Sequence, residues 1–246
     1  MRKDWWDKEF QWLFTLGEST TAGGWTSCRE RSWPAQLARM INEFQRFPTQ
    51  LVNMGIGANV ISQKSAGYDA SSKPCLSERL EKHVLSHTAN GLPVVPDLLI
   101  ISYGLNDARS GTPIATFREE MSRIIARVRE RIQPLVVLPG PSYMIDFQLG
   151  GKDWNHANVE LMQRYNEAIA ELAAREDALF VDLLAAYGGA DWLVHFDGCH
   201  SNDLGHRLIA NGVFEVLASN CSGLSLETKA LEKYISPWRD ESTLQQ

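Results

Sequence analysis

The chain of 246 residues is 44% hydrophobic and 22% charged, proportions that are ordinary for a soluble globular protein and suit one α/β domain. Its 24 basic and 30 acidic residues give a net charge of −6 and are dispersed along the chain, which argues against a nucleic-acid-binding surface. No apolar run approaches the roughly 20 residues of a membrane-spanning helix.

The first ten residues are charged and aromatic, and they lack the apolar core and cleavage site of a secretory signal. A cytoplasmic protein is therefore expected, unless a leader has been removed. Trp5 and Trp6 are expected to cover a sheet edge or a partner, so a homodimer is one expectation. The cysteines are scattered without a Cys-x-x-Cys pair and fit neither a zinc site nor a disulfide framework, so mostly free thiols are expected. They are Cys28, Cys75, Cys199 and Cys221.

Strand-like and helix-like segments alternate along the chain. The predicted strands cover residues 11–16, 50–54, 98–102, 135–138 and 179–182. Amphipathic helices are predicted after residue 34, around 80–85, over 113–132, around 162–172 and over 203–218, and a loop is predicted over 55–76. The alternation predicts parallel strands with right-handed crossovers, a three-layer α/β/α sandwich. We expect one domain over 1–246, with a lead-in at 1–9 and a weakly patterned tail at 223–246.

The first predicted strand ends in Gly17-Glu18-Ser19, which small and polar residues follow. The hydroxyl of Ser19 would lie where a buried strand opens toward solvent, and it becomes a nucleophile if the chain supplies a base, an orienting acid and oxyanion donors. A serine that caps the following turn is the alternative. An ordinary α/β-hydrolase is excluded because it needs Gly-x-Ser-x-Gly, and Thr21 stands at the second glycine position.

A carboxylate and an imidazole lie three residues apart in Asp197-Gly198-Cys199-His200, just before the last predicted helix. His200 could take the proton of Ser19 while Asp197 orients the imidazole and stabilises its charged form. The alternative is a helix-capping segment with His200 on the surface. The other histidines are expected to be structural or surface residues: His83, His87, His156, His195 and His206.

Two further polar blocks, at residues 53–58 and 104–107, also follow predicted strands. In a parallel α/β sheet such groups gather at the carboxyl ends of the strands, so they can meet Ser19 in one cleft. The side-chain amide of Asn106 and the backbone N–H of Ser19 could donate to a developing oxyanion. For residues 55–57 a plain strand-to-loop turn is the alternative.

These four blocks, in this order, resemble the SGNH (also called GDSL) hydrolase family of serine esterases and lipases. The resemblance covers most of the chain, from Phe14 to the helix after His200. It implies a flavodoxin-like sandwich with a five-stranded parallel sheet. It also implies the catalytic residues Ser19, Asp197 and His200, with Asn106 in the oxyanion hole.

The sequence departs from the family pattern at two positions. A third oxyanion donor, a backbone N–H, is implied at Ala58, where the family has glycine, and Gly57 is the fallback. The N–H survives such a replacement if the local backbone tolerates a Cβ atom. Glu18 stands where the family usually has Asp, a difference expected to change hydrogen bonds near the nucleophile without changing the nucleophile itself.

The loop at residues 139–155 is unusually long and carries aromatic residues, which indicates a functional segment. Tyr143, Phe147 and Trp154 are expected either to line a substrate wall or lid, or to belong to a packed surface segment or dimer contact. Arg109 lies close enough to Asn106 to contact a polar substrate group, with a solvated arginine as the alternative.

The sequence therefore predicts a serine hydrolase that cleaves carboxylic esters through an acyl-serine intermediate, without metal or cofactor. The expected substrate is a small-molecule ester with a short acyl group, such as acetyl on a carbohydrate or another small hydroxylated molecule. Lipase, thioesterase and acyltransferase activities use the same groups and stay open. The alternative from a different class is a non-catalytic ligand-binding domain on a flavodoxin-like fold.

Overall fold

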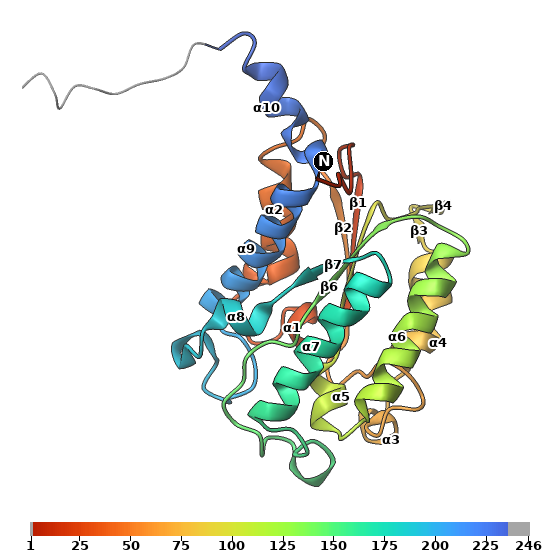
Figure 1. Ribbon diagram of the computed structural model, residues 1–246, viewed down its shortest axis with the longest axis vertical. Coiled ribbons are helices and arrows are strands. Elements are labelled where there is room, and N and C mark those ends of the chain that lie inside the picture. The colour runs from red at the N-terminus through yellow and green to blue at the C-terminus, as the bar shows by residue number, and fades with distance from the viewer. Residues whose placement is uncertain (1, 236–246) are drawn as a thin grey trace, which may run out of the picture.

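A computed structural model of the protein, described over residues 2–235, contains a five-stranded parallel sheet (Figure 1). The strand order is β2-β1-β5-β6-β7, and all four pairings are parallel. The strands are β1 (Trp12–Gly17), β2 (Gln50–Gly55), β5 (Leu98–Ser102), β6 (Leu135–Pro139) and β7 (Leu179–Val181). Each begins and ends within one residue of its predicted bounds, and the predicted α/β sandwich is confirmed.

Apolar cores lie on both faces of the sheet, because successive side chains of a strand point to opposite faces. One face carries Phe14, Leu16, Leu99, Ile101, Val136 and Leu138. The other carries Leu13, Leu98, Ile100, Leu135 and Val137. Burial on both faces explains why the central strands are continuous apolar runs in the sequence rather than alternating ones.

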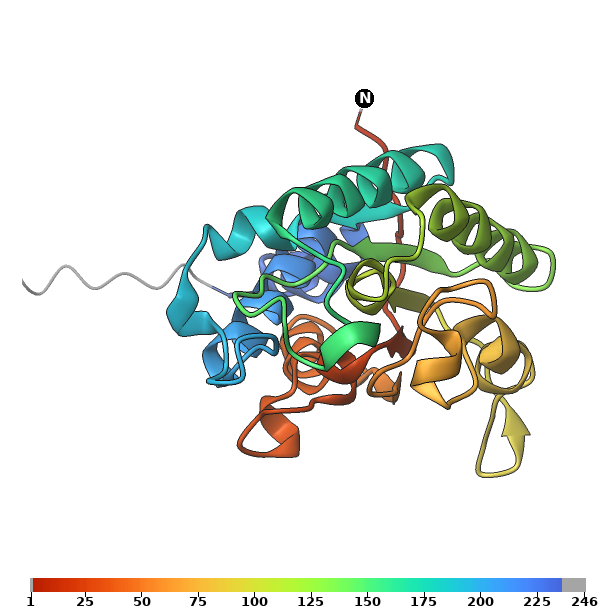
Figure 2. The ribbon, with the colours of Figure 1, turned by 90° about the horizontal axis from the view of Figure 1, so that it is seen from below.

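Helices cover the two faces as separate layers (Figure 2). Helices α6 (Ile114–Arg129) and α7 (Val159–Arg175) pack on the face that carries Phe14. Helices α2 (Trp33–Asn42) and α9 (Asp203–Asn220) contact each other and pack on the opposite face. The predicted helix over 113–132 is shorter than expected, because α6 ends at Arg129.

Several short elements were not predicted. The helix predicted around 80–85 is present as α4 (Leu76–Leu80) with a π-helical turn at Glu81–Leu85, whereas the loop expected over 55–76 contains the unpredicted helix α3 (Tyr68–Ser71). A small hairpin, β3 (Thr88–Ala89) and β4 (Leu92–Pro93), and the helix α8 (Leu183–Tyr187) complete this set. These pieces are too short to show a hydrophobic period, which is why pattern reasoning misses them.

The lead-in and the tail pack together at the end of α9. Trp5 donates its backbone N–H to the carbonyl of Asn220 at 2.9 Å, and the ring of Trp6 stacks on Phe10 with centroids 5.7 Å apart. The expected unpatterned tail instead contains a 3-10 turn at Ser222–Ser225 and the helix α10 (Leu226–Leu231), and residues 236–246 lie outside the described range.

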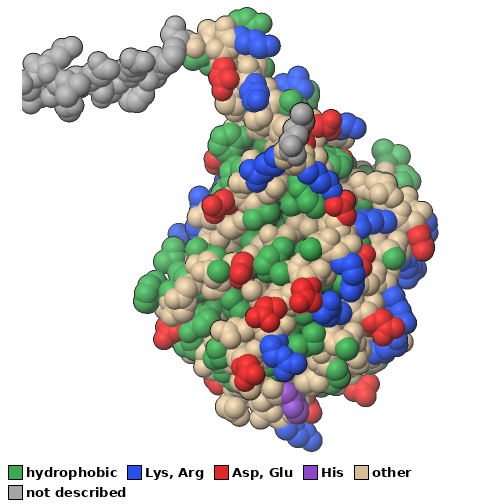
Figure 3. All heavy atoms as spheres, viewed as in Figure 1, with side chains coloured by type: hydrophobic (Ala, Val, Ile, Leu, Met, Phe, Trp, Pro, Cys, Tyr) green, Lys and Arg blue, Asp and Glu red, His purple; other side chains and the backbone are tan. Residues whose placement is uncertain are grey.

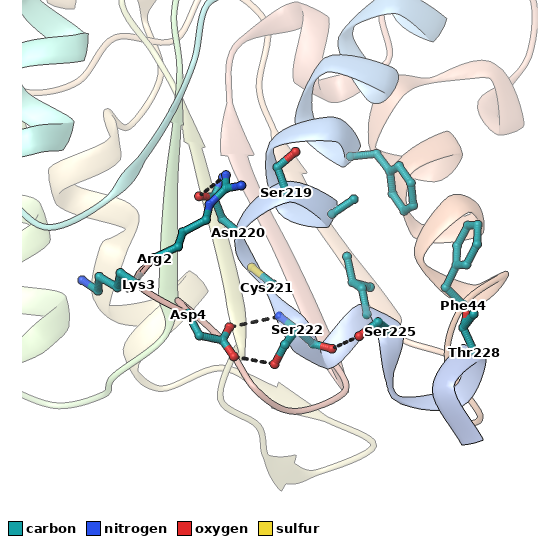
Figure 4. A pocket seen from close by; sticks show the side chains of 13 residues that line it. Arg2, Lys3, Asp4, Phe44, Ser219, Asn220, Cys221, Ser222, Ser225 and Thr228 are labelled. Atoms are coloured by element: carbon teal, nitrogen blue, oxygen red, sulfur yellow. Dashed lines mark hydrogen bonds between the residues drawn. The ribbon is translucent and has the colours of Figure 1, made fainter. Parts of the chain in front are cut away.

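A pocket of about 480 Å³ lies between the lead-in, α9 and α10 (Figure 4). At its edge Asp4 accepts hydrogen bonds from the backbone and side chain of Ser222. Acidic and basic side chains are interspersed on the face of the molecule seen in Figure 3. Within residues 2–235, no helix has both the length and the hydrophobicity needed to cross a bilayer.

The carboxyl ends of the parallel strands meet at one edge of the sheet. The short helix α1 (Ser19–Ala22) follows β1 there, and α5 (Leu105–Arg109) follows β5. Figure 1 shows α1 and α5 toward the lower end of the sheet, away from the N-terminus. This edge therefore brings together the segments in which the sequence motifs lie.

Candidate active site

Ser19 is the first residue of α1 and directly follows the turn out of strand β1. A Cβ atom on Gly17 would lie 2.1 Å from Oγ1 of Thr21 and 2.8 Å from the carbonyl oxygen of Ser102. Glycine is thus required where the strand turns sharply into the helix. The turn leaves Ser19 only 6% exposed, with its hydroxyl aimed along the sheet edge at a residue 181 positions away.

The structure brings Ser19, His200 and Asp197 into one hydrogen-bonded row. Oγ of Ser19 lies 2.8 Å from Nε2 of His200, and Nδ1 of His200 lies 2.6 Å from Oδ2 of Asp197. The second carboxylate oxygen of Asp197 accepts the backbone N–H groups of Cys199 and His200, both at 3.0 Å. The alternative of a surface His200 is wrong, since its side chain is buried.

Burial and hydrogen bonding set the charges of this row. Burial lowers the pKa of the His200 imidazole, and the hydrogen bond and charge of Asp197 oppose this effect without cancelling it. Burial also acts to raise the pKa of Asp197, but the N–H donors of His200 and Cys199 outweigh it and hold that pKa below its ordinary value. The arrangement is a neutral imidazole between a hydroxyl and a carboxylate, which can accept a proton from the hydroxyl.

Besides the backbone N–H of Ser19 itself, the two other expected oxyanion donors lie on segments near Ser19 and Glu18. A Cβ atom on Gly57 would be 3.8 Å from Cβ of Ser19, so the segment after β2 contacts the serine. Ala58 adopts a left-handed backbone with φ of 55°, a conformation that normally favours glycine. Asn106 is buried, and its Nδ2 donates to the carbonyl of Asn59 at 3.1 Å, which leaves its second amide hydrogen for another acceptor.

Glu18, which precedes the serine, holds the Asn106 segment in place. Its Oε1 accepts the backbone N–H of Gly104 at 3.2 Å and of Asn106 at 3.0 Å. Burial, with the neighbouring Asp107 carboxyl, raises the pKa of Glu18 to about 8. Burial also raises the pKa of Asp107 to about 7, although Ser65 donates to it at 2.5 Å. Sequence reasoning located Glu18 but had no signal for these partners, which are 86 or more residues distant.

Arg109 is buried, so the alternative of a solvated arginine is wrong. Its guanidinium donates to Oδ1 of Asn106 at 3.3 Å and to the carbonyl of Leu149 at 2.5 Å. The same guanidinium lies 5.9 Å from the ring centroid of Trp154. Arg109 and Trp154 thus connect Asn106 to the long loop.

The other two aromatic residues of the long loop, Tyr143 and Phe147, line a different feature. Together with Met144 and Met162 they border an apolar pocket of about 280 Å³ between the loop, α7 and α8. The hydroxyl of Tyr143 donates to Asp191 at 2.9 Å. Neither Ser19 nor His200 borders this pocket, so the structure does not bring these two aromatic residues to the hydroxyl–imidazole row.

Sequence reasoning missed Trp25, which contacts the imidazole of His200 directly. The two rings are stacked, with centroids 3.3 Å apart and planes inclined by 6°. Trp25 follows two glycines just after α1, and that position near the candidate nucleophile was the only available signal. His206, in contrast, is buried and accepts the backbone N–H of Trp33 through Nδ1, as a structural histidine would.

A family model described as the GDSL-like lipase/acylhydrolase family matches residues 15–208. No curated protein matches the chain in sequence. Among solved structures, a lipase/acylhydrolase from Enterococcus faecalis is similar with a TM-score of 0.64 at 20% identity, covering 85% of this chain and 96% of its own.

Two esterases are similar to the same extent. The M. smegmatis aryl esterase has a TM-score of 0.63 at 18% identity and covers 85% of this chain and 99% of its own. An acetylxylan esterase from Geobacillus stearothermophilus has a TM-score of 0.61 at 18% identity and covers 84% and 94%. At these identities the likeness shows the shared fold.

Proposed function

The chain belongs to the GDSL-like lipase/acylhydrolase family, and from this premise we propose that it hydrolyses carboxylic esters with Ser19 as the nucleophile. The observation that carries the proposal is the hydrogen-bonded row, 2.8 Å from Ser19 Oγ to His200 Nε2 and 2.6 Å from His200 Nδ1 to Asp197 Oδ2. A serine beside a neutral imidazole, itself oriented by a carboxylate, is the arrangement that activates a hydroxyl for acyl transfer.

In the first half-reaction Oγ of Ser19 attacks the ester carbonyl while Nε2 of His200 takes the hydroxyl proton. The negative charge on the carbonyl oxygen accepts hydrogen bonds from the backbone N–H groups of Ser19 and Ala58 and from the free amide hydrogen of Asn106. Collapse of the tetrahedral intermediate breaks the bond to the alcohol, which receives the proton from His200. The acyl group remains on Ser19.

In the second half-reaction His200 takes a proton from water as that water attacks the acyl-serine. Collapse releases the carboxylic acid and returns the proton to Oγ of Ser19. Asp197 stays ionised throughout, because its backbone donors lower its pKa and it serves to orient the imidazole and stabilise its charge. The cycle needs no group beyond these side chains, the backbone donors and water.

The substrate that we propose carries a short acyl group, such as acetyl, on a carbohydrate or another small hydroxylated molecule. Two observations support this choice. The apolar pocket at Tyr143 and Phe147 is not bordered by Ser19, so it offers no direct apolar channel from the nucleophile for a long chain. The acetylxylan esterase from Geobacillus stearothermophilus also has this fold.

The test is hydrolysis of p-nitrophenyl acetate, butyrate and octanoate by the wild type and by Ser19→Ala. We expect Ser19→Ala to reduce kcat by roughly 10⁶-fold, with acetate as the best wild-type substrate. A matched control is Ser142→Ala, because Ser142 is also 6% exposed and should have full activity. A fluorophosphonate should label Ser19 alone. A well-folded wild type without turnover or adduct would refute the proposal.

A further inference from the structure

Trp25 lies on a loop whose backbone conformation is unfavourable for a large side chain. Helix α1 ends at Ala22, Gly23 follows with φ of 86°, and Trp25 itself has φ of 67°. A bulky residue in the left-handed region is uncommon and persists only where the surroundings stabilise it. Its side chain nevertheless remains 43% exposed, so burial of the indole alone does not explain the conformation.

Hydrogen bonds hold this loop on both sides of Trp25. On one side Gly24 donates its N–H to the carbonyl of Ser19 at 3.0 Å. On the other side Ser27 donates its N–H at 2.8 Å and its hydroxyl at 2.6 Å to the carboxylate of Asp203, at the start of α9. The indole is therefore placed between the nucleophile helix and the helix that follows the candidate base.

The contact that results is a face-to-face stack on the candidate base. The indole of Trp25 and the imidazole of His200 are 3.3 Å apart between centroids and inclined by only 6°. The stacked face is perpendicular to the direction of the hydrogen bonds, since Nε2 and Nδ1 of His200 point in the ring plane to Ser19 and Asp197. The two hydrogen bonds fix the ring edges and the indole limits motion out of the plane.

We propose that Trp25 is a positioning residue for the ester hydrolysis at Ser19: its indole holds the plane of the His200 imidazole and stabilises the imidazolium formed when the serine proton is taken. This inference rests on the proposed function. The face of an indole carries negative electrostatic potential and attracts a cation placed over it. The interaction is therefore stronger with the charged imidazole, which forms in the transition state, than with the neutral ring of the resting enzyme.

The other groups around His200 do not provide this stabilisation by themselves. Asp197 favours the charged ring, whereas the positive charge of Arg109 and the neighbouring His195 disfavour it, and Ser19 is the proton donor. The ring of His195 is edge-on to Trp25 with centroids 6.5 Å apart, and its Nδ1 lies 3.6 Å from Oδ1 of Asp197. Trp25 is the group that covers the ring face.

The first experiment compares Trp25→Phe and Trp25→Leu with the wild type. We expect Trp25→Leu, which keeps apolar cover but loses the aromatic face, to lower kcat by about ten- to thirty-fold with KM changed less than about twofold. Trp25→Phe should stay within about threefold of the wild type. The acid limb of kcat/KM should move to lower pH in Trp25→Leu and return in Trp25→Phe. Trp192→Leu, which removes a tryptophan that is 74% exposed, is the matched control.

A second measurement does not depend on turnover. Protonated imidazole quenches the fluorescence of an indole in contact with it. The fluorescence of Trp25, obtained as the difference between the wild type and Trp25→Phe, should therefore fall as the pH is lowered through the pKa of His200. His200→Gln should abolish this titration. The absence of the titration in the wild type would overturn the stack in solution and with it the proposal.

Failure of the reaction and failure of the role of Trp25 give different experimental results. A wild type that neither turns over esters nor labels at Ser19 refutes the reaction, and the role of Trp25 in it falls too. If the wild type is active and Trp25→Leu has the same kcat and the same pH profile, only the role of Trp25 is refuted.

Discussion

Replacing Glu18 by Gln should change how the stability of the protein depends on pH. In the folded chain burial raises the pKa of Glu18 from 4.5 to about 8. A carboxyl with a raised folded pKa stabilises the fold fully below its unfolded pKa, and this stability is lost as pH rises toward the folded pKa. With a pKa of 4.5 in the unfolded chain and about 8 in the folded chain, the free energy of unfolding should fall by about 3–4 kcal/mol between pH 5 and pH 8.

Glu18→Gln removes this titration while keeping the geometry. The side-chain oxygen of Gln accepts hydrogen bonds, so it can still bind the backbone N–H groups of Gly104 and Asn106. Urea unfolding of both proteins at half-unit steps from pH 5 to pH 8 measures the effect. The difference in unfolding free energy, wild type minus variant, should fall by about 3–4 kcal/mol across this range. Because the charge of Asp107 raises the pKa of Glu18, the two titrations are coupled, and the difference reports Glu18 together with that coupling.

The activity of the variant provides the control. The Gln side chain can still accept both backbone N–H groups of the Asn106 segment. We therefore expect kcat of Glu18→Gln at pH 7 to stay within about tenfold of the wild type, a smaller loss than that expected when an oxyanion donor is removed. Parallel stability curves for the two proteins would show that Glu18 titrates near its ordinary pKa. That result would refute the reasoning from burial.

Three further outcomes are expected. Asn106→Ala should lower kcat by roughly 10²–10³-fold with little change in KM, and a normal kcat in steady-state assays would remove its oxyanion role. Ala58→Gly should raise the unfolding free energy by up to about 1 kcal/mol, because φ of 55° suits glycine better, and should keep activity; a loss of stability in urea unfolding would contradict the strain argument. The acid limb of kcat/KM should lie below pH 6.5, because burial lowers the pKa of His200, and a limb above pH 6.5 would contradict this.

The sheet and the positions of the site motifs were predictable because both depend on local pattern. Continuous apolar runs such as 98–102 identify buried parallel strands, and chain connectivity then places their carboxyl ends at one edge. That rule alone brings Ser19 and Asn106 to the same edge, although 86 residues separate the two in sequence. Neither inference needs the identity of any side-chain partner.

The side-chain environment was not predictable for the opposite reason. From the sequence a solvated Arg109 is expected, because arginine side chains are usually exposed. Only the folded chain shows that its guanidinium donates to Asn106 and to the carbonyl of Leu149 instead of to water. The contact of Trp25 with His200 likewise spans 175 positions, and no local period indicates which ring an aromatic side chain will meet.

The hydrogen bonds divide the site into two units, which meet where Ser19 and Trp25 contact His200. In the first unit, Glu18 binds the backbone of the Asn106 segment, so the nucleophile and this donor move together. In the second, the carbonyl of Gly198 accepts the N–H groups of residues 145 and 146, so the acid–base turn depends on the long loop.

Gly198 shows how closely the second unit is packed. Its φ is 74°, and a Cβ atom there would lie 2.5 Å from Cβ of Asp146. A side chain at this position would push the long loop and the turn of His200 apart. We therefore expect changes in the long loop to displace the base relative to the nucleophile more than they alter the segment that carries Ser19. Arg109, which binds both Asn106 and the loop carbonyl of Leu149, bridges the two units and limits such displacement, as does the stack of Trp25 on His200.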